Sequence, residues 1–294
     1  MSETSVEIGG KKVNVLIEGK GKPLLFFYDQ WHTSWGLVPL LEELRYRFRV
    51  YGVNPPGFGG STLTDEFART TKEYAAFLGE ALQSVAGGRV ILVLHDIGVP
   101  IGIEALAEGY APLDRLDGVV IMNGPVYEAQ QPNSFSMRPS PFLRSRDLPT
   151  DRIAHRRRIL RLSGEPGRLD EGLTEACWDY YIKGFLRDQV KLGLDIDQSL
   201  TASATRLQTI SETGIPLLVL WGEEDPLGGK EIAQRLGEDL PNAEGFLLPE
   251  VGHFPHVEAP RAVAEELWAF VSRSRPVPTS NGDAVSSPPP DESK

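Results

Sequence analysis

The chain has 294 residues, of which 40% are hydrophobic and 24% charged, so it is long enough for a globular protein with a sizeable buried core. Its formal net charge of −11 argues against a nucleic-acid partner, and the lack of a long apolar run or a secretory signal argues against a membrane partner or export. The single cysteine, Cys177, excludes an intrachain disulfide and fits a cytoplasmic location.

The first part of the chain alternates short apolar runs with helical patterns. Residues 5–18 alternate apolar and polar side chains around Gly9 and Gly10, which predicts a hairpin. Strands are then predicted at 23–28, 48–53, 89–95 and 116–122, and helices at 36–46, 69–86 and 97–109. Because several strands are apolar on both faces, we predict an α/β fold with a mostly parallel sheet covered by helices on both sides.

The alternation stops between residues 125 and 213, where the chain is polar, rich in Arg and Pro at first, and then helical. We interpret residues 125–213 as a helical cap inserted over the site, and residues 1–124 and 214–273 as the two parts of the core. In the second part, strands are predicted at 215–222 and 245–249, before a last helix at 259–273. Residues 274–294 are mostly Pro, Ser, Asp and Gly and predict a disordered tail.

Asp96 is the most informative residue, because it follows the apolar run Ile91-Leu-Val-Leu-His95 at the expected end of a buried strand. Reactive groups in parallel sheets lie at this end of the strands. Many hydrolases carry Gly-x-Ser-x-Gly here, and in this chain a carboxylate occupies the serine position. A carboxylate can displace a leaving group from saturated carbon and form an alkyl-enzyme ester. The expected substrates are therefore epoxides or carbon–halogen compounds.

A lone Asp after a strand is more often a turn residue, so the assignment depends on other segments. Trp221-Gly-Glu-Glu-Asp225 places Asp225 just after a strand, and His253 follows the last predicted strand. The order nucleophile, acid, base is that of α/β-hydrolases. Asn54-Pro-Pro-Gly-Phe-Gly-Gly-Ser61 resembles the Pro-Gly-x-Gly-x-Ser loop of the same fold family.

From Tyr28 to about Ser272 the chain therefore resembles the α/β-hydrolase fold proteins. Within them, the Asp nucleophile resembles that of epoxide hydrolases and of haloalkane and haloacid dehalogenases, and the motif is most similar to that of epoxide hydrolases. The resemblance implies that Asp96 attacks carbon. His253, oriented by Asp225, would then activate the water that hydrolyses the ester.

The resemblance also implies two backbone donors for the oxyanion formed in that hydrolysis, the N–H groups of Ile97 and Gln30. The family's usual His-Gly in the second loop is replaced here by Tyr28-Asp29. Two interpretations remain open. Either the sequence of the loop has changed without consequence, because the loop supplies only a backbone N–H, or the pocket is reshaped. In the second case the residue that contacts substrate is Asp29, Gln30, Trp31 or His32. Asp29 would add a second carboxylate near Asp96, which would raise the pKa of one of the two.

Ile97 offers no side-chain donor for a departing halide, which favours an epoxide hydrolase over a dehalogenase. Opening an epoxide requires an acid that protonates the alkoxide. The resemblance implies that cap residues supply it, and the candidates are Tyr180, Tyr181, Tyr127 and His155. Packing of a cap helix on the core explains the two adjacent tyrosines equally well. Trp178, Tyr28 and His256 are further candidates for the substrate pocket, and His95 is expected to be a buried, hydrogen-bonded histidine.

Several alternatives stay open. A haloalkane or haloacid dehalogenase would share the first step, and an ester hydrolase is disfavoured without a serine. A non-hydrolytic cyclase or isomerase, or a binding protein on the same fold, would explain the lost His-Gly but not the three retained site residues. No cluster has metal-ligand spacing, so no metal and no cofactor are expected. The expected partner is a small organic molecule, and the sequence leaves the oligomeric state open, a homodimer included.

Overall fold

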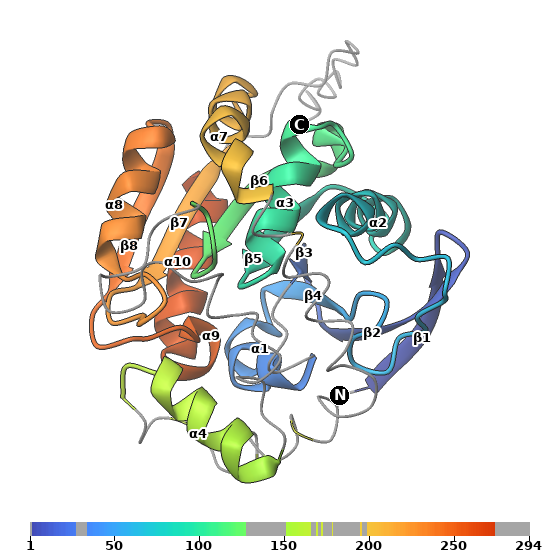
Figure 1. Ribbon diagram of the computed structural model, residues 1–294, viewed down its shortest axis with the longest axis horizontal. Coiled ribbons are helices and arrows are strands. Elements are labelled where there is room, and N and C mark those ends of the chain that lie inside the picture. Colours follow the sequence, from blue (N-terminus) through green and yellow to red (C-terminus); the bar gives the residue numbers. More distant parts are fainter. Residues whose placement is uncertain are drawn as a thin grey trace, which may run out of the picture.

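The computed structural model describes residues 2–27, 34–127, 151–165, 169, 172, 178, 195 and 199–273. In this part of the chain the strands form one eight-stranded sheet, with the order β1-β2-β4-β3-β5-β6-β7-β8 (Figure 1). The strands are β1 (Ser2–Ile8), β2 (Lys11–Gly19), β3 (Lys22–Phe27), β4 (Phe48–Val53), β5 (Val90–His95), β6 (Leu116–Met122), β7 (Leu217–Gly222) and β8 (Ala243–Leu248).

Only β1 and β2 run antiparallel to their neighbours, and all pairings from β4 to β8 are parallel. The carboxyl ends of β5, β6 and β7 therefore meet at one edge of the sheet. The predicted hairpin is formed by β1 and β2, and the predicted strands at 48–53 and 116–122 coincide with β4 and β6. The α/β-hydrolase fold predicted from the sequence is thus confirmed.

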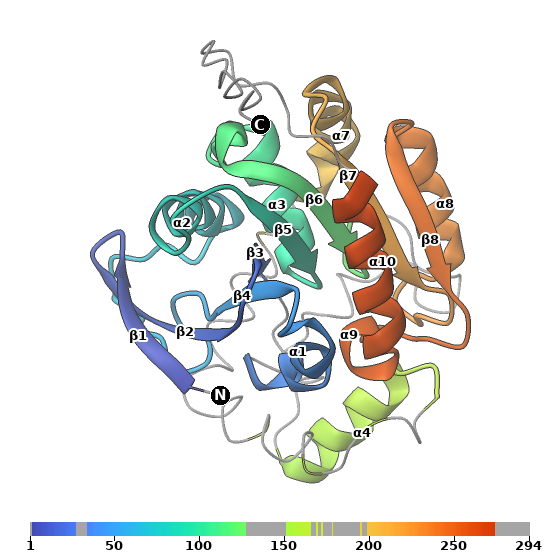
Figure 2. The same cartoon turned by 180° about the vertical axis from the view of Figure 1, so that it is seen from behind.

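Helices cover both faces of this sheet (Figures 1 and 2). One face carries α2 (Thr71–Ser84), α3 (Gly98–Ala107), α7 (Ser203–Glu212) and α8 (Lys230–Asp239). The other face carries α1 (Val38–Leu44) and α10 (Pro260–Arg273). The remaining short or peripheral helices are η1 (Ser34–Leu37), η2 (Leu113–Arg115), α4 (Arg152–Leu162), η5 (Leu200–Ala202) and α9 (Pro255–Glu258).

The two apolar layers follow from the alternation of side chains along each strand. On β3, Leu25 and Phe27 pack into the layer under α2 and α3, whereas Leu24 and Phe26 pack into the layer under α1 and α10. Every one of these four side chains is at most 1% exposed. Such double burial explains why the central strands read as continuous apolar runs instead of alternating ones.

Two helices differ from their predicted bounds for local reasons. The pattern at 36–46 contains a 3-10 turn, η1, followed by α1, which has Pro39 in its first turn. The last helix, predicted at 259–273, is α10, and a short helix that was not predicted, α9, precedes it across Ala259, whose φ of −140° is not helical. Ala259 precedes Pro260, and the proline ring disfavours a helical conformation in the residue before it.

The segment between β6 and β7 holds α4, η5 and α7. The C-terminal end of α4 bonds to the loop after β8, and α7 packs against α3 and α8. Much of the predicted cap at 125–213, and all of the predicted tail at 274–294, lie outside the described residues, so both stay predictions. Among the residues described, no helix is long and apolar enough to cross a membrane.

Candidate active site

Asp96 occupies a strained turn between β5 and α3. Its φ is +50°, a left-handed conformation that non-glycine residues adopt rarely and at a cost in energy. Its N–H donates to the carbonyl oxygen of Asn123 at 2.8 Å. A Cβ at Gly98 would lie 2.4 Å from the Phe27 carbonyl oxygen, and one at Gly124 would lie 2.6 Å from the Asp96 carbonyl oxygen. The turn is thus enclosed by backbone on two sides, as in the strand–turn–helix elbow that presents a hydrolase nucleophile.

The sequence of this turn departs from Gly-x-Ser-x-Gly at its first glycine as well as at its serine. Leu94 stands at the first glycine position, and Gly98 stands at the second. A Cβ at Gly102, on α3, would lie 2.3 Å from Leu94 Cδ1. The extra bulk of Leu94 is therefore accommodated by a glycine about one helical turn beyond the elbow.

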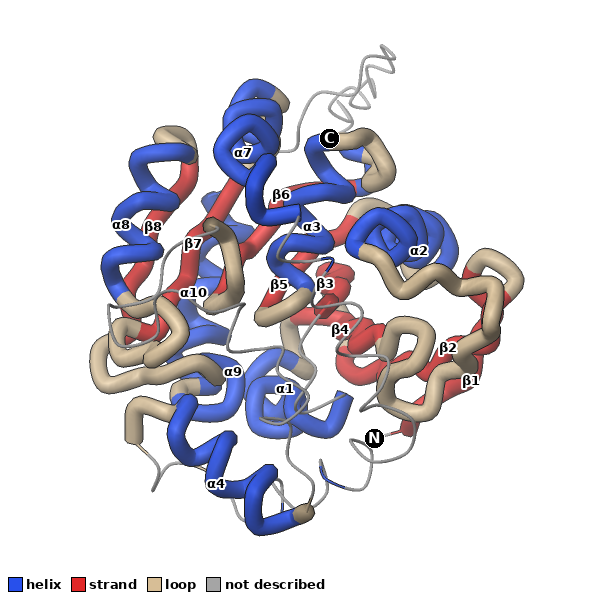
Figure 3. The backbone as a smooth tube through the Cα atoms, viewed as in Figure 1, coloured by secondary structure: helices blue, strands red, loops and turns tan. Residues whose placement is uncertain are grey.

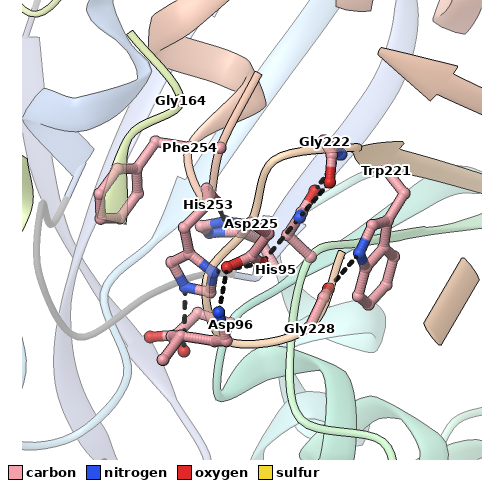
Figure 4. A network of polar contacts seen from close by, with 12 residues as sticks. His95, Asp96, Gly164, Trp221, Gly222, Asp225, Gly228, His253 and Phe254 are labelled. Atoms are coloured by element: carbon pink, nitrogen blue, oxygen red, sulfur yellow. Dashed lines mark hydrogen bonds and ion pairs between the residues drawn. The ribbon is translucent and has the colours of Figure 1, made fainter. Parts of the chain in front are cut away.

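His253 lies between the two carboxylates that the sequence singled out (Figure 4). Its Nδ1–H donates to Asp225 Oδ2 at 2.9 Å, and its Nε2 lies 3.5 Å from Asp96 Oδ1. The side chains of Asp96 and His253 are fully buried, and Asp225 is 5% exposed. The loops after β5, β7 and β8 thus bring the three predicted residues into one contact chain at the same edge of the sheet (Figure 3).

Side-chain hydrogen bonds hold the Asp225 loop. Asn123 Nδ2 donates to Asp225 Oδ2 at 2.8 Å, and the N–H of Leu227 donates to Asp225 Oδ1 at 2.9 Å. The indole N–H of Trp221 closes the loop on the carbonyl oxygen of Gly228 at 2.7 Å. Both carboxylate oxygens of Asp225 are therefore occupied, and Oδ2 receives the imidazole in a fixed direction.

The loops of Asp225 and His253 also meet through their backbones. A Cβ at Gly222 would lie 2.1 Å from the carbonyl oxygen of Gly252, so a side chain has no room there. The N–H of Glu224 donates to the Val251 carbonyl oxygen at 2.9 Å. This close approach explains why the sequence has glycine at position 222 of the Trp-Gly motif.

The two carboxylates control the protonation of His253. Burial by itself lowers the pKa of the imidazole, but the charges and hydrogen bonds of Asp225 and Asp96 overcome this and raise it to about 10. In the resting site at neutral pH, His253 is therefore an imidazolium between two carboxylates. Conversion of Asp96 into a neutral group would remove one of the two causes and lower this pKa.

The structure describes only some of the other residues that we predicted to lie in the site. Ile97 is buried and caps the N-terminus of α3, so its N–H belongs to the first helical turn, where N–H groups lack helical partners. Several further candidates lie outside the described residues: Tyr28, Asp29, Gln30, Trp31, His32, Tyr180 and Tyr181. Their roles stay predictions.

The side chain of Tyr127 contacts two residues of α8. Its hydroxyl donates to Asp239 Oδ2 at 2.5 Å, and the guanidinium of Arg235 lies 3.9 Å from the centre of its ring. Burial raises the pKa of the Tyr127 phenol, and the hydrogen bond to Asp239 raises it further. Proton donation from Tyr127 to a substrate would require the hydrogen bond to Asp239 to break. Tyr127 is therefore a weaker candidate for the acid than Tyr180 or Tyr181.

The remaining candidates are buried aromatic residues. The rings of His155 and Trp178 pack 5.3 Å apart between centroids. The ring centroid of His256 lies 4.7 Å from that of His95. The His256 ring also packs against the ring of Phe26. His95 is fully buried, and its Nε2–H donates to the carbonyl oxygen of His253 at 2.7 Å, as expected of a hydrogen-bonded core histidine.

Asn123 is the residue that sequence reasoning missed. Its carbonyl oxygen accepts from Asp96 N–H, its Nδ2 donates to Asp225, and its Oδ1 accepts from Gly222 N–H at 2.8 Å. It thereby joins the turn of the nucleophile position to the loop of Asp225. The available signal was its place directly after the apolar run 116–122, at the carboxyl edge where β5 and β7 also end. Among the described residues, no three His, Cys, Asp or Glu side chains are grouped so as to hold a metal ion.

Comparison with known proteins agrees with this fold. The family model described as "Alpha/beta hydrolase family" matches residues 26–266. Haloalkane dehalogenase 2 of Mycobacterium bovis is 25% identical over 264 residues, which cover 86% of this chain and 89% of that protein.

Two of the similar solved structures cover most of the chain. One is the meta-cleavage product hydrolase CumD of Pseudomonas fluorescens IP01, with a TM-score of 0.77 and 15% identity, covering 92% of this chain and 98% of that one. The other is the epoxide hydrolase CorEH, with a TM-score of 0.71 and 17% identity, covering 93% of this chain and 99% of that one. The names of these proteins span three reactions, so the likeness of the solved structures shows the fold alone and selects no substrate. With the family model matching most of its length, the chain belongs to the alpha/beta hydrolase family of hydrolytic enzymes.

Proposed function

We propose that the protein is an epoxide hydrolase that acts through an alkyl-enzyme ester on Asp96. The main support is a carboxylate at the strained turn after β5, with its Oδ1 3.5 Å from His253 Nε2. A carboxylate in this place favours attack on saturated carbon, because its ester with an alkyl group is stable enough to form and reactive enough to be hydrolysed. Asp96, Asp225 and His253 are the nucleophile, acid and base of this proposal.

The first step opens the ring. A carboxylate oxygen of Asp96 forms a bond to one epoxide carbon while the bond from that carbon to the ring oxygen breaks. The resulting alkoxide takes a proton from an acid, for which the Tyr180–Tyr181 pair is proposed, within a cap formed by residues 125–213. Alkylation neutralises Asp96, so the pKa of His253 falls from about 10 and the imidazolium can return a proton to the acid.

The second step hydrolyses the ester. Neutral His253 takes a proton from water at Nε2, and the water oxygen bonds to Cγ of Asp96. The backbone N–H of Ile97 and a second donor near Gln30 would stabilise the developing oxyanion. The bond from Cγ to the Asp96 oxygen that attacked the epoxide then breaks; this oxygen leaves on the substrate carbon and receives the proton from His253. The remaining water proton, on the new Asp96 carboxyl group, then passes to His253 and restores the imidazolium. The products are a vicinal diol and a free Asp96 carboxylate that contains one oxygen from water.

Dehalogenation is a second candidate, because a haloalkane dehalogenase is 25% identical to the chain over most of its length. It would use the same attack by Asp96, with halide in place of the ring oxygen as leaving group. The residue after the nucleophile is Ile97, which is buried and has no N–H or charge in its side chain to receive a halide. This residue supports the epoxide over the carbon–halogen substrate.

The proposal includes a small organic substrate and a cytoplasmic location. The location is supported by cysteine usage, with Cys177 as the only cysteine of the chain. The net charge of −11 supports the absence of a nucleic-acid partner. Neither feature bears on the oligomeric state, and a homodimer stays compatible with both.

The test is a panel of epoxides and haloalkanes, with diol and halide measured as products. We expect diol from at least one epoxide with the unaltered protein, and none with Asp96→Ala. Asp65→Ala is the matched control, because Asp65 is an exposed loop residue in the same chain. Halide release without diol formation would indicate that the protein is a dehalogenase and not an epoxide hydrolase. Full activity of a folded Asp96→Ala protein would exclude Asp96 as the nucleophile.

A further inference from the structure

Glu258 is a buried carboxylate outside the Asp96–Asp225–His253 chain, and it accepts three backbone hydrogen bonds. It ends the short helix α9 and is 6% exposed. Its Oε2 accepts from the N–H of Gly164 at 2.8 Å and of Gly252 at 3.0 Å, and its Oε1 accepts from the N–H of Phe254 at 3.1 Å. Bonds of this kind to a charged acceptor offset the cost of burying the carboxylate.

Two of these donors flank His253 in the sequence. Gly252 precedes it and Phe254 follows it, so one side chain fixes the backbone on both sides of the imidazole. The backbone conformation sets the direction of the Cα–Cβ bond of His253. It therefore also sets the direction in which the imidazole points. Glu258 therefore determines how well Nδ1 meets Asp225 and Nε2 meets Asp96, at 2.9 and 3.5 Å.

The third donor comes from the segment that follows α4. Gly164 lies close to the His253 loop (Figure 4), and the N–H of His253 itself donates to the carbonyl oxygen of Leu162 at 2.7 Å. A Cβ at Gly252 would lie 2.3 Å from Gly164 N and 2.5 Å from Leu162 O. The C-terminal end of α4 and the His253 loop are therefore in direct backbone contact, and Glu258 bonds to both.

We propose that Glu258 is a positioning residue for His253: its carboxylate holds the loop of the base in register with the end of α4. The inference rests on the proposed function, since it assigns to Glu258 an effect on ester hydrolysis, the step that uses His253. It assigns no effect on ring opening. The Asp96 turn is held by Asn123, Gly124 and Phe27 instead, and Glu258 makes none of those contacts.

Glu258→Gln tests this with little change in shape. The amide keeps one acceptor oxygen but places an NH₂ group against at least one of the three backbone donors, so at least one bond is lost. We expect ester hydrolysis to slow by about 10²-fold, the scale for displacing a catalytic group by an ångström. Alkylation of Asp96 should keep its rate, so that the alkyl-enzyme accumulates and is seen by rapid quench and intact-protein mass spectrometry. Glu265→Gln, at an exposed ion pair with Arg261, is the matched control and should behave as the unaltered protein.

A second variant leaves Glu258 in place and moves its partner. A Cβ at Gly164 would lie 2.5 Å from the Glu250 carbonyl oxygen, so Gly164→Ala should push the end of α4 away from the His253 loop. We expect the same selective slowing of ester hydrolysis. Gly237→Ala is the control, because Gly237 lies on α8 with no heavy atom within 4 Å of the added Cβ.

A substrate-free measurement separates failure of this inference from failure of the proposed function. The Nδ1 proton of His253, bonded to Asp225, should give a downfield proton resonance that is missing in His253→Gln. We expect Glu258→Gln to broaden or shift it, and Glu265→Gln to leave it unchanged. If Glu258→Gln lowers only the melting temperature and changes neither the resonance nor the hydrolysis step, Glu258 is merely structural and the inference is overturned. If no substrate alkylates any variant, the proposed function fails, and the resonance alone decides the role of Glu258.

Discussion

Asn123 donates a hydrogen bond of 2.8 Å to Asp225, and it does so to Oδ2, the same oxygen that receives the imidazole of His253. The carboxylate that receives the His253 imidazole is thus itself oriented by an amide at the end of a neighbouring strand. Because the Asn123 carbonyl oxygen also accepts from Asp96 N–H, one residue sets the relative position of both carboxylates.

Replacing Asn123 by Ala should disturb the base more than the nucleophile. The Asp225 side chain loses its amide donor, whereas the backbone bond to Asp96 can persist. A hydrogen bond to a charged group contributes about 1.5–3 kcal/mol, so ester hydrolysis should slow by roughly 10-fold or more. Single-turnover kinetics measure this step. The control is Asn242→Ala at an exposed turn position, and equal rates for the two variants would contradict the role given to Asn123.

His253→Gln should trap the alkyl-enzyme. Asp96 attacks without the imidazole, but the ester then lacks the base that activates water. Intact-protein mass spectrometry should show an adduct of the mass of the substrate, and peptide mapping should place it on Asp96. In the unaltered protein, turnover in H₂¹⁸O should introduce the heavy oxygen into Asp96. Loss of turnover without an adduct would indicate that His253 activates water for direct attack on substrate.

The charge state of His253 predicts a pH dependence of stability. Burial lowers its pKa, but Asp225 and Asp96 raise it to about 10 in the folded protein, above the ordinary value of 6.5. A raised pKa means that the charged form stabilises the fold fully below pH 6.5 and that this contribution is lost as the pH rises through about 10. Urea unfolding of the unaltered protein and of His253→Gln between these limits measures it. The stability advantage of the unaltered protein should shrink with rising pH, and a constant difference would refute the imidazolium assignment.

Replacing Tyr180 and Tyr181 together by Phe should separate the two candidate reactions. Ring opening needs a proton on the alkoxide, so alkyl-enzyme formation from an epoxide should fall by about 10²-fold or more. A halide leaving group has no such need. Tyr46→Phe is the control, since Tyr46 is 78% exposed. An unchanged rate of alkyl-enzyme formation from epoxides would indicate that His155 or Tyr127 is the acid instead. If Tyr127 is the acid, its hydrogen bond to Asp239 would have to open.

The strands were predictable because the physics that forms them is local in the sequence. Central strands buried on both faces must be apolar throughout, and β4 and β6 accordingly begin and end where the apolar runs do. The contact of Asp96, Asp225 and His253 was predictable for a different reason. Strand order and motif spacing together place their loops at one edge of the sheet.

The contacts of Asn123 and Glu258 were not predictable, because most of their partners are backbone groups and some of these lie far away in the chain. Glu258 bonds to Gly164, 94 positions away, and Asn123 to Gly222, 99 positions away. A backbone N–H has no signature in the sequence, so such bonds become visible only in three dimensions. The start of α10 beside Pro260 was predicted to within one residue, whereas the short helix α9 before it was not predicted.

The arrangement of the strands also fixes when, during synthesis, Asp96, Asp225 and His253 can first come into contact. The turn of Asp96 is complete once β5, α3 and β6 have left the ribosome, and domains tend to fold from the N-terminus onward. His253 emerges far later: its carbonyl bonds to His95 across 158 positions of chain. A nascent chain that stops before β8 would carry the Asp96 turn without the imidazole of His253. The contact between His253 and Asp96 can therefore form only when the segment from β8 to His253 has docked against the earlier strands.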